Sequence, residues 1–123
     1  MTRTVCVGKP SALQKKVYGI VQRAQAAGLA AVKPGKTAGD VDAASRNIIK
    51  KAGYGKRFGH GTGHGVGMEV HEDPRVSPKA PEVLKPGMAI TVEPGIYLDG
   101  HFGVRIEDLV IVQDRGYTNM YRT

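Results

Sequence analysis

Residues 59–73 carry the side chains of this sequence that are best suited to chemistry. Three of the four histidines, His60, His64 and His71, fall in this stretch, and five glycines are interspersed with them. Glycine packs nothing and weakens both helices and strands, so this pattern is unusual for a packed element. It favours a backbone that comes close to a bound group, with the imidazoles directed at that group. A metal ion together with a peptide substrate fits this description best.

Two other interpretations of the same residues are weaker. A glycine-rich turn with incidental histidines is the simpler one, and it loses weight because carboxylates follow downstream in strand-like surroundings. A phosphate-binding loop fits poorly, because no Lys-Ser or Lys-Thr pair closes the run and no strong strand precedes it.

Two glutamates further along the chain could complete a metal site. Glu93 ends the apolar run 88–92 and precedes a proline, which favours extended geometry at the glutamate. Glu107 lies inside the apolar run 104–112. The alternatives are a solvent-facing strand end for Glu93 and an internal ion pair with Arg105 for Glu107, because residues two apart on a strand share a face.

One histidine and two glutamates form a donor set that suits Zn, Mn, Co or Fe(II) rather than Ca or Mg. Three protein ligands with an open position are also typical of catalytic zinc sites. Such an ion would acidify a bound water and polarise a carbonyl group. A nearby histidine, His71, would then hydrogen-bond the tetrahedral intermediate or transfer a proton.

Four ordered segments of the chain resemble the catalytic domain of the pita-bread metallopeptidases, a family that includes methionine aminopeptidases, prolidases and Xaa-Pro aminopeptidases. The segments are Gly63–Gly67, His71–Pro74, Thr91–Gly95 and Val104–Asp108. The Glu-Pro-Gly-Ile-Tyr run and His60 look most like the Xaa-Pro branch. The resemblance implies hydrolysis of N-terminal Xaa-Pro peptide bonds by a metal-activated water, on peptides with proline at the second position.

The same resemblance implies roles for individual residues. The implied metal ligands are His64, Glu93 and Glu107. His60 and His71 correspond to the substrate and proton-transfer histidines, and Arg105 corresponds to the arginine beside the last ligand.

The chain also departs from the family pattern. The family uses two further aspartates, on a β-hairpin that precedes the first helix of this chain, and neither is present; Asp40 and Asp42 lie in a predicted helix and cannot replace them. We therefore expect residues 1–123 to form a single domain, a truncated catalytic domain that lacks its N-terminal half. It should hold at most one divalent metal (Mn, Co or Zn) of the family's two, and should be inactive by itself. The alternative is a non-catalytic peptide- or protein-binding module on the same fold.

Two helices precede the glycine–histidine stretch. Ser11 begins a helix that is expected to run to about residue 27 and to end at Gly28. Thr37 and Asp40 form a capping pair for a second helix, which ends at Gly53. Apolar residues recur at helical spacing on both, and these faces require a sheet to cover them. They include Leu13, Val17, Val21, Val41 and Ile48.

The remaining elements are expected to be extended. Residues 2–7 alternate and indicate a strand in which Cys6 is buried. Residues 74–86 indicate a surface connection, and residues 88–93 and 104–112 indicate strands. A strand, two helices and a β-rich remainder indicate the α+β class. The resemblance refines this to a partial pita-bread fold, with two helices packed on a curved antiparallel sheet.

The composition limits the kinds of partner that we expect this protein to bind. The formal charge is +7, from 18 basic and 11 acidic residues, but the basic residues are scattered without interleaved aromatics. Solvated helix faces account for them, so we expect no nucleic-acid partner.

The apolar runs are too short to span a membrane. A single cysteine and no leader indicate the cytoplasm. Because the chain supplies only part of a sheet, we expect an exposed apolar surface or self-association as a homo-oligomer.

Overall fold

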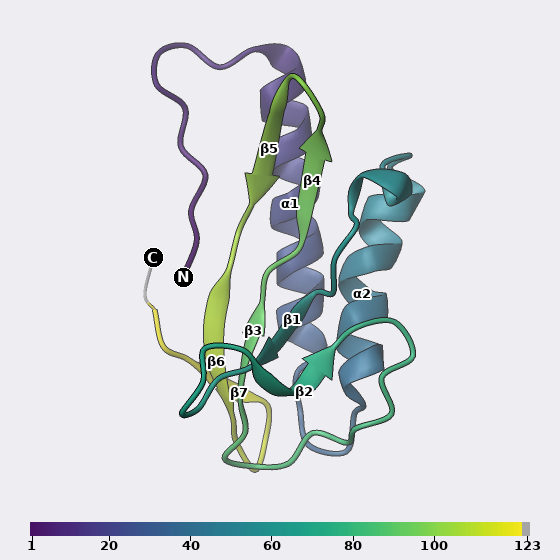
Figure 1. Ribbon diagram of the computed structural model, residues 1–123, viewed down its shortest axis with the longest axis vertical. Helices are drawn as coiled ribbons and strands as arrows, with labels where there is room; N and C mark the ends of the chain where they lie inside the picture. Colours follow the sequence, from purple (N-terminus) through teal and green to yellow (C-terminus); the bar gives the residue numbers. More distant parts are fainter. Residues whose placement is uncertain (122–123) are drawn as a thin grey trace.

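The computed structural model describes residues 1–121, and it places two helices against a curved antiparallel sheet (Figure 1). The helices are α1 (Ala12–Ala31) and α2 (Ala38–Lys51), followed by the short 3-10 helix η1 (Gly55–Arg57). The strands are β1 (Gly63–Gly65), β2 (Glu72–Val76), β3 (Ala89–Val92), β4 (Gly95–Leu98), β5 (Phe102–Arg105), β6 (Asp108–Val112) and β7 (Tyr117–Asn119). The predicted α+β class is confirmed.

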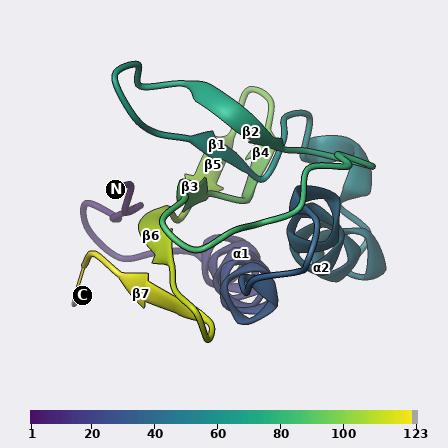
Figure 2. The same cartoon turned by 90° about the horizontal axis from the view of Figure 1, so that it is seen from below.

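The strands form two antiparallel sheets. Five of them follow the order β2-β1-β3-β6-β7, and β4 and β5 form a separate hairpin. Strands β3 and β6 are the centre of the larger sheet and pair from Ala89 with Ile111 to Val92 with Asp108. Seen from below, the larger sheet curves around α1 and α2 (Figure 2), so one of its faces and the inner helix faces bury each other.

Helix α1 begins as predicted but extends beyond its predicted end. Ser11 and Gln14 form the capping box at its start, whereas the helix continues through Gly28 to Ala31. A β-carbon at Gly28 would collide with the Ser45 hydroxyl and would lie 2.8 Å from a methyl carbon of Val92. This glycine therefore allows α1, α2 and β3 to approach one another and does not end the helix.

We expect Gly28→Ala to lower the free energy of unfolding by about 1–3 kcal/mol, because overpacking outweighs the gain in helix propensity. Gly19 provides a matched control in the same helix. A β-carbon there would meet only the end of the Arg23 side chain, at 3.5 Å. Gly19→Ala should therefore stabilise the protein by about 0.5–1 kcal/mol. Urea unfolding of the two variants measures both changes, and equal stabilisation by both would contradict the packing role of Gly28.

The strand predicted over residues 2–7 is wrong. Only Thr2 pairs with another strand-like residue, in an isolated bridge to Glu107. Val5 and Val7 are 81% and 99% exposed, and Cys6 is exposed rather than buried. Alternating β-branched residues favour an extended chain, but a strand also needs a partner ladder, and none of the described residues provides one beyond Thr2.

Two further boundaries differ from the prediction. The run 104–112 is divided into β5 and β6, because β5 pairs with β4 whereas β6 pairs with β3. Glu107 lies at this change of sheet. The stretch 74–86 also contains more structure than a surface connection, since it begins within β2 and its side chains Val76 and Leu84 are buried in the core.

The helix faces that were expected to lie open are largely covered. Val17, Val21 and Val41 are fully buried, and only Leu13 is exposed among the large apolar residues of α1. The exposed apolar side chains lie elsewhere and include Val5, Val7, Met68 and Val70. Self-association stays a prediction. Among residues 1–121, no helix is both long and apolar enough to cross a membrane.

Candidate functional site

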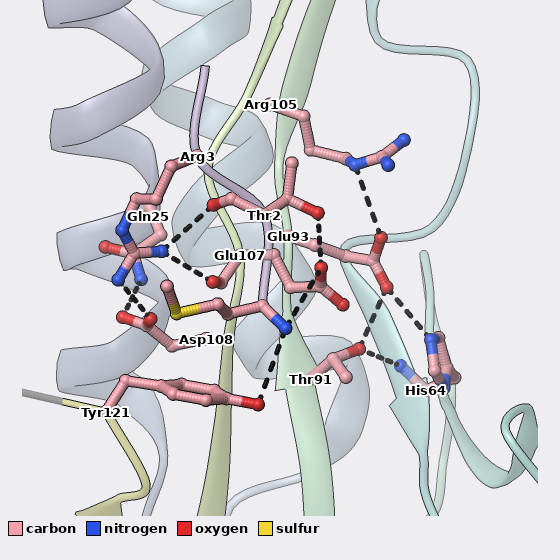
Figure 3. A network of polar contacts seen from close by, with 11 residues as sticks. Thr2, Arg3, Gln25, His64, Thr91, Glu93, Arg105, Glu107, Asp108 and Tyr121 are labelled. Carbon is pink, nitrogen blue, oxygen red and sulfur yellow. Dashed lines mark hydrogen bonds and ion pairs between the residues drawn. The ribbon is translucent and has the colours of Figure 1, made fainter. Parts of the chain in front are cut away.

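The three predicted metal ligands converge from three separate parts of the fold. His64 lies on β1, Glu93 directly follows β3, and Glu107 lies between β5 and β6. One ligand atom from each lies within 4.8 Å of the other two. Their side chains are only 12%, 15% and 17% exposed. Figure 3 shows His64 and Glu93 in contact, with Glu107 beside them.

The donor set and its spacing fit one divalent cation. Ligand atoms that share an ion at about 2.1 Å lie at most about 4.2 Å apart, so shifts of a few tenths of an ångström close the site. His64 supports this fit. Its Nδ1 lies 2.8 Å from the Gly65 carbonyl oxygen, which can only accept, so Nδ1 carries a proton. In the neutral ring, Nε2 then has only a lone pair, and this lone pair faces Glu93 Oε1 at 3.0 Å. Two hydrogen-bond acceptors repel each other at this distance unless a proton or a cation lies between them.

The two carboxylates are held differently. Thr2 Oγ1 donates to Glu107 Oε2 at 2.5 Å, and Arg105 Nε lies 4.0 Å from Glu93 Oε2. The ion pair of Arg105 with Glu107, the alternative to a ligand role for Glu107, is not formed, and Arg105 lies nearest to Glu93 instead. The pKa of Arg105 is raised, first by its hydrogen bond to the Tyr97 hydroxyl and then by the two glutamates.

Asp108, the neighbour of Glu107, has a structural role. It is 5% exposed and accepts hydrogen bonds from Arg3 at 2.6 Å, Gln25 at 2.9 Å and Asn119 at 3.0 Å. Burial opposes its ionisation, but these donors outweigh burial and hold the pKa of its carboxyl below the usual range. Asp108 thereby joins the N-terminal segment and α1 beside Glu107 (Figure 3), and its bond to Asn119 adds β7.

The predicted catalytic residues surround a pocket next to this cluster. His60, His71 and Arg105 line an open pocket of about 320 Å³ together with Glu93. The His71 ring centroid lies 4.3 Å from that of His64. The structure therefore brings the six predicted site residues together, and their roles stay predictions.

Sequence reasoning missed Arg75, which lines the same pocket. Arg75 pairs with His64 in the β1–β2 register, and residues paired across an antiparallel ladder point to the same face. The alternation within β2, where Pro74 and Val76 are buried and Arg75 is exposed, was the available signal. It was hidden because the prolines in this stretch indicated a loop.

A buried ion pair on α2 holds the glycine–histidine stretch and was also missed. Asp42 is 1% exposed and accepts from both Arg46 Nε and Nη2 at 2.8 Å. The same carboxylate accepts from the backbone N–H and the hydroxyl of Thr62, at 3.1 and 2.8 Å. Arg46 donates in turn to the carbonyl oxygens of Phe58 and His60, at 3.0 and 2.7 Å. This pair fixes the backbone on both sides of His60.

Two glycines of the stretch, Gly63 and Gly65, also have a packing role that was not predicted. A β-carbon at Gly63 would collide with the Thr91 carbonyl on β3, and one at Gly65 would collide with the Asp73 carbonyl on β2. The close approach that requires glycine is thus made to the neighbouring strands. It holds the short strand β1 tightly between β2 and β3, and this fixes the position of His64.

Comparison with known proteins decides the family. The sequence pattern of metallopeptidase family M24 matches residues 1–114. The chain belongs to metallopeptidase family M24. This M24 chain is 49% identical over 123 residues to the Xaa-Pro dipeptidase of Pyrococcus furiosus, covering 100% of this chain and 35% of that protein. It is 52% identical over 116 residues to an uncharacterized peptidase of Bacillus subtilis, covering 94% of this chain and 33% of that protein.

Solved structures agree with the sequence comparison. The prolidase from Pyrococcus furiosus superposes with a TM-score of 0.96 at 49% identity, covering 98% of this chain and 36% of that one. The X-Pro aminopeptidase from Thermotoga maritima superposes with a TM-score of 0.94 at 42% identity, covering 98% and 34%. The predicted resemblance and the partial pita-bread fold are confirmed. This M24 chain spans about a third of the length of the relatives that it matches.

Proposed function

We propose that this M24 chain carries the metal-ligating and substrate-binding part of a peptidase that hydrolyses N-terminal Xaa-Pro peptide bonds. The convergence of His64, Glu93 and Glu107 beside a pocket lined by histidines and arginines carries this proposal. The similarity to an Xaa-Pro dipeptidase over the whole chain supports the reaction class.

In this proposal the three ligands hold one divalent cation, Mn, Co or Zn. When bound, such an ion supplies Lewis acidity and lowers the pKa of a coordinated water. The family uses two cations, and Glu107 is the only ligand of the second that this chain retains. We therefore propose that residues 1–123 act as a truncated catalytic domain, with at most one cation, and that turnover belongs to a longer protein.

The residues around the pocket act on the substrate. His71 is adjacent to His64 and can hydrogen-bond the developing oxyanion or move a proton. His60 is held by a 2.7 Å hydrogen bond between its Nε2 and the Tyr97 hydroxyl. Arg75 and Arg105 give the pocket positive charge, which suits the carboxylate end of a short peptide. These groups favour a short peptide whose carboxylate lies in the pocket, and the similarity to an Xaa-Pro dipeptidase supports proline in second position.

Two further parts of the proposal concern the setting of the protein. We propose a cytoplasmic protein, in line with its single cysteine. We also propose that exposed apolar side chains such as Val5 and Val7 support self-association. The competing function, a non-catalytic peptide-binding module on the same fold, requires peptide binding that does not depend on metal.

A metal titration tests the proposed site. The wild-type chain should bind one equivalent of Co²⁺ or Mn²⁺ in isothermal titration calorimetry. His64→Ala should weaken binding by at least about a hundredfold, since loss of a ligand costs more than loss of an outer hydrogen-bond partner. His101→Ala is the matched control, because His101 is exposed and lies outside the cluster, and it should bind like wild type. Equal effects of the two substitutions, or no binding by the wild-type chain, would reject the site.

A further inference from the structure

Thr91 connects two of the three proposed ligands through a single hydroxyl group. Its Oγ1 accepts a hydrogen bond from the backbone N–H of His64 at 3.1 Å and donates one to Glu93 Oε1 at 2.9 Å (Figure 3). The side chain is 4% exposed, so water does not substitute readily for either contact. A hydroxyl has one proton to donate, and here it is directed at the carboxylate.

The surroundings of Thr91 restrain this hydroxyl to one position. Its neighbours on β3, Ile90 and Val92, are fully buried in the core on the other face of the strand. A β-branched side chain on a strand has few accessible rotamers, so the position of Oγ1 follows from the position of the backbone. Strand β3 is anchored in turn by four residue pairs with β6.

Strand β1 pairs with β3 over a short length, with backbone hydrogen bonds on either side of it, from Glu93 N–H to the Thr62 carbonyl oxygen at 2.6 Å and from Val66 N–H to the Ala89 carbonyl oxygen at 3.0 Å. Gly65 and Ile90 form the single residue pair between the two strands. The Thr91 hydroxyl adds a connection at His64, where that ladder has no pair. The glycine at position 63 permits the approach, since any β-carbon there would collide with the Thr91 carbonyl. Among these restraints, the Thr91 hydroxyl is the one that joins the His64 backbone directly to the Glu93 carboxylate.

We propose that Thr91 is a positioning residue that presets His64 and Glu93 for one divalent cation. This inference rests on the proposed function, because it assumes that the two residues are ligands. Without the hydroxyl, Glu93 Oε1 loses a donor that restrains it, and the His64 backbone N–H loses its acceptor. Both ligands then sample positions that do not share an ion, which lowers the metal affinity.

The test separates the effect of the Thr91 hydroxyl from that of its methyl group. Thr91→Val keeps the shape of threonine and removes the hydroxyl, and Thr91→Ser keeps the hydroxyl and removes the methyl group. We expect Thr91→Val to weaken Co²⁺ binding by about 10- to 100-fold and to alter the visible absorption spectrum of the bound Co²⁺. Thr91→Ser should stay within a few-fold of wild type. If Thr91→Val does not fold, Thr91→Ala compared with Thr91→Ser isolates the same group.

Gly39→Ala serves as a control for stability, because a β-carbon there would lie 2.8 Å from the Ala80 carbonyl oxygen and Gly39 lies outside the ligand cluster. It should bind Co²⁺ with wild-type affinity and spectrum. If wild type binds Co²⁺ and Thr91→Val binds it equally well with the same spectrum, the positioning role is rejected while the metal site stands. If wild type binds no Co²⁺, the metal site itself is rejected, and the role of Thr91 is rejected with it.

Discussion

The 123-residue chain should hydrolyse Xaa-Pro peptides at least about a thousandfold more slowly than a longer chain that also carries the two aspartates of the family, whichever of Mn²⁺, Co²⁺ or Zn²⁺ is added. Loss of a positioned nucleophile and of one Lewis acid each removes several kcal/mol of transition-state stabilisation. About 1.4 kcal/mol corresponds to a tenfold change in rate. The adjacent carboxylate cannot compensate, because Asp108 is held by Arg3, Gln25 and Asn119.

A chimera provides the longer chain for this comparison. Residues 1–123 would replace the matching segment of the Pyrococcus furiosus Xaa-Pro dipeptidase, to which they are 49% identical. The chimera should turn over an Xaa-Pro dipeptide. His71→Ala in the chimera should lower turnover by about 10²–10⁴-fold, as expected for a lost proton-transfer group, and His101→Ala should leave it unchanged. Equal turnover by the 123-residue chain and the chimera would overturn the proposal and would point to another carboxylate, such as Asp73, in the missing role.

Asp42→Ala should lower the free energy of unfolding by about 3–5 kcal/mol, because it leaves the guanidinium of Arg46 buried without its partner. The Arg46 side chain is 12% exposed, and its charge also lies 4.1 Å from the centre of the Phe58 ring. The substitution also removes the acceptor for Thr62, whose carbonyl oxygen accepts a hydrogen bond from the backbone N–H of Glu93 at 2.6 Å. Chemical denaturation followed by circular dichroism measures the loss.

An exposed ion pair gives the matched control for Asp42. Asp99 is 91% exposed and lies 3.7 Å from Arg57. Surface pairs of this kind contribute about 0–1 kcal/mol, so Asp99→Ala should change stability little. If Asp42→Ala and Asp99→Ala lowered stability equally, the α2 ion pair would not be the anchor of the glycine–histidine stretch.

Local interactions explain what could be predicted from the sequence. Ser11 and Thr37 begin helices because each bonds to a backbone N–H three residues later, and this geometry is complete within one turn. The end of the second helix at Gly53 was also predictable, because glycine readily adopts the positive φ angle, 88°, that the chain has there. The identity of the candidate ligands followed in the same way, from residue types and their order.

Contacts between distant residues decided the rest. Residues 2–7 have the composition of a strand but find almost no partner, and Gly28, a good helix end by local rules, lies inside α1 because Ser45 and Val92 pack against it. Local alternation places Arg75 on the exposed face of β2, and the register of β1 with β2 brings it beside His64 in the pocket. The sequence by itself therefore determined which side chains are available for chemistry and where the helices begin. Only the tertiary structure decided which of them meet, because pairing between strands depends on residues that are far apart in the chain.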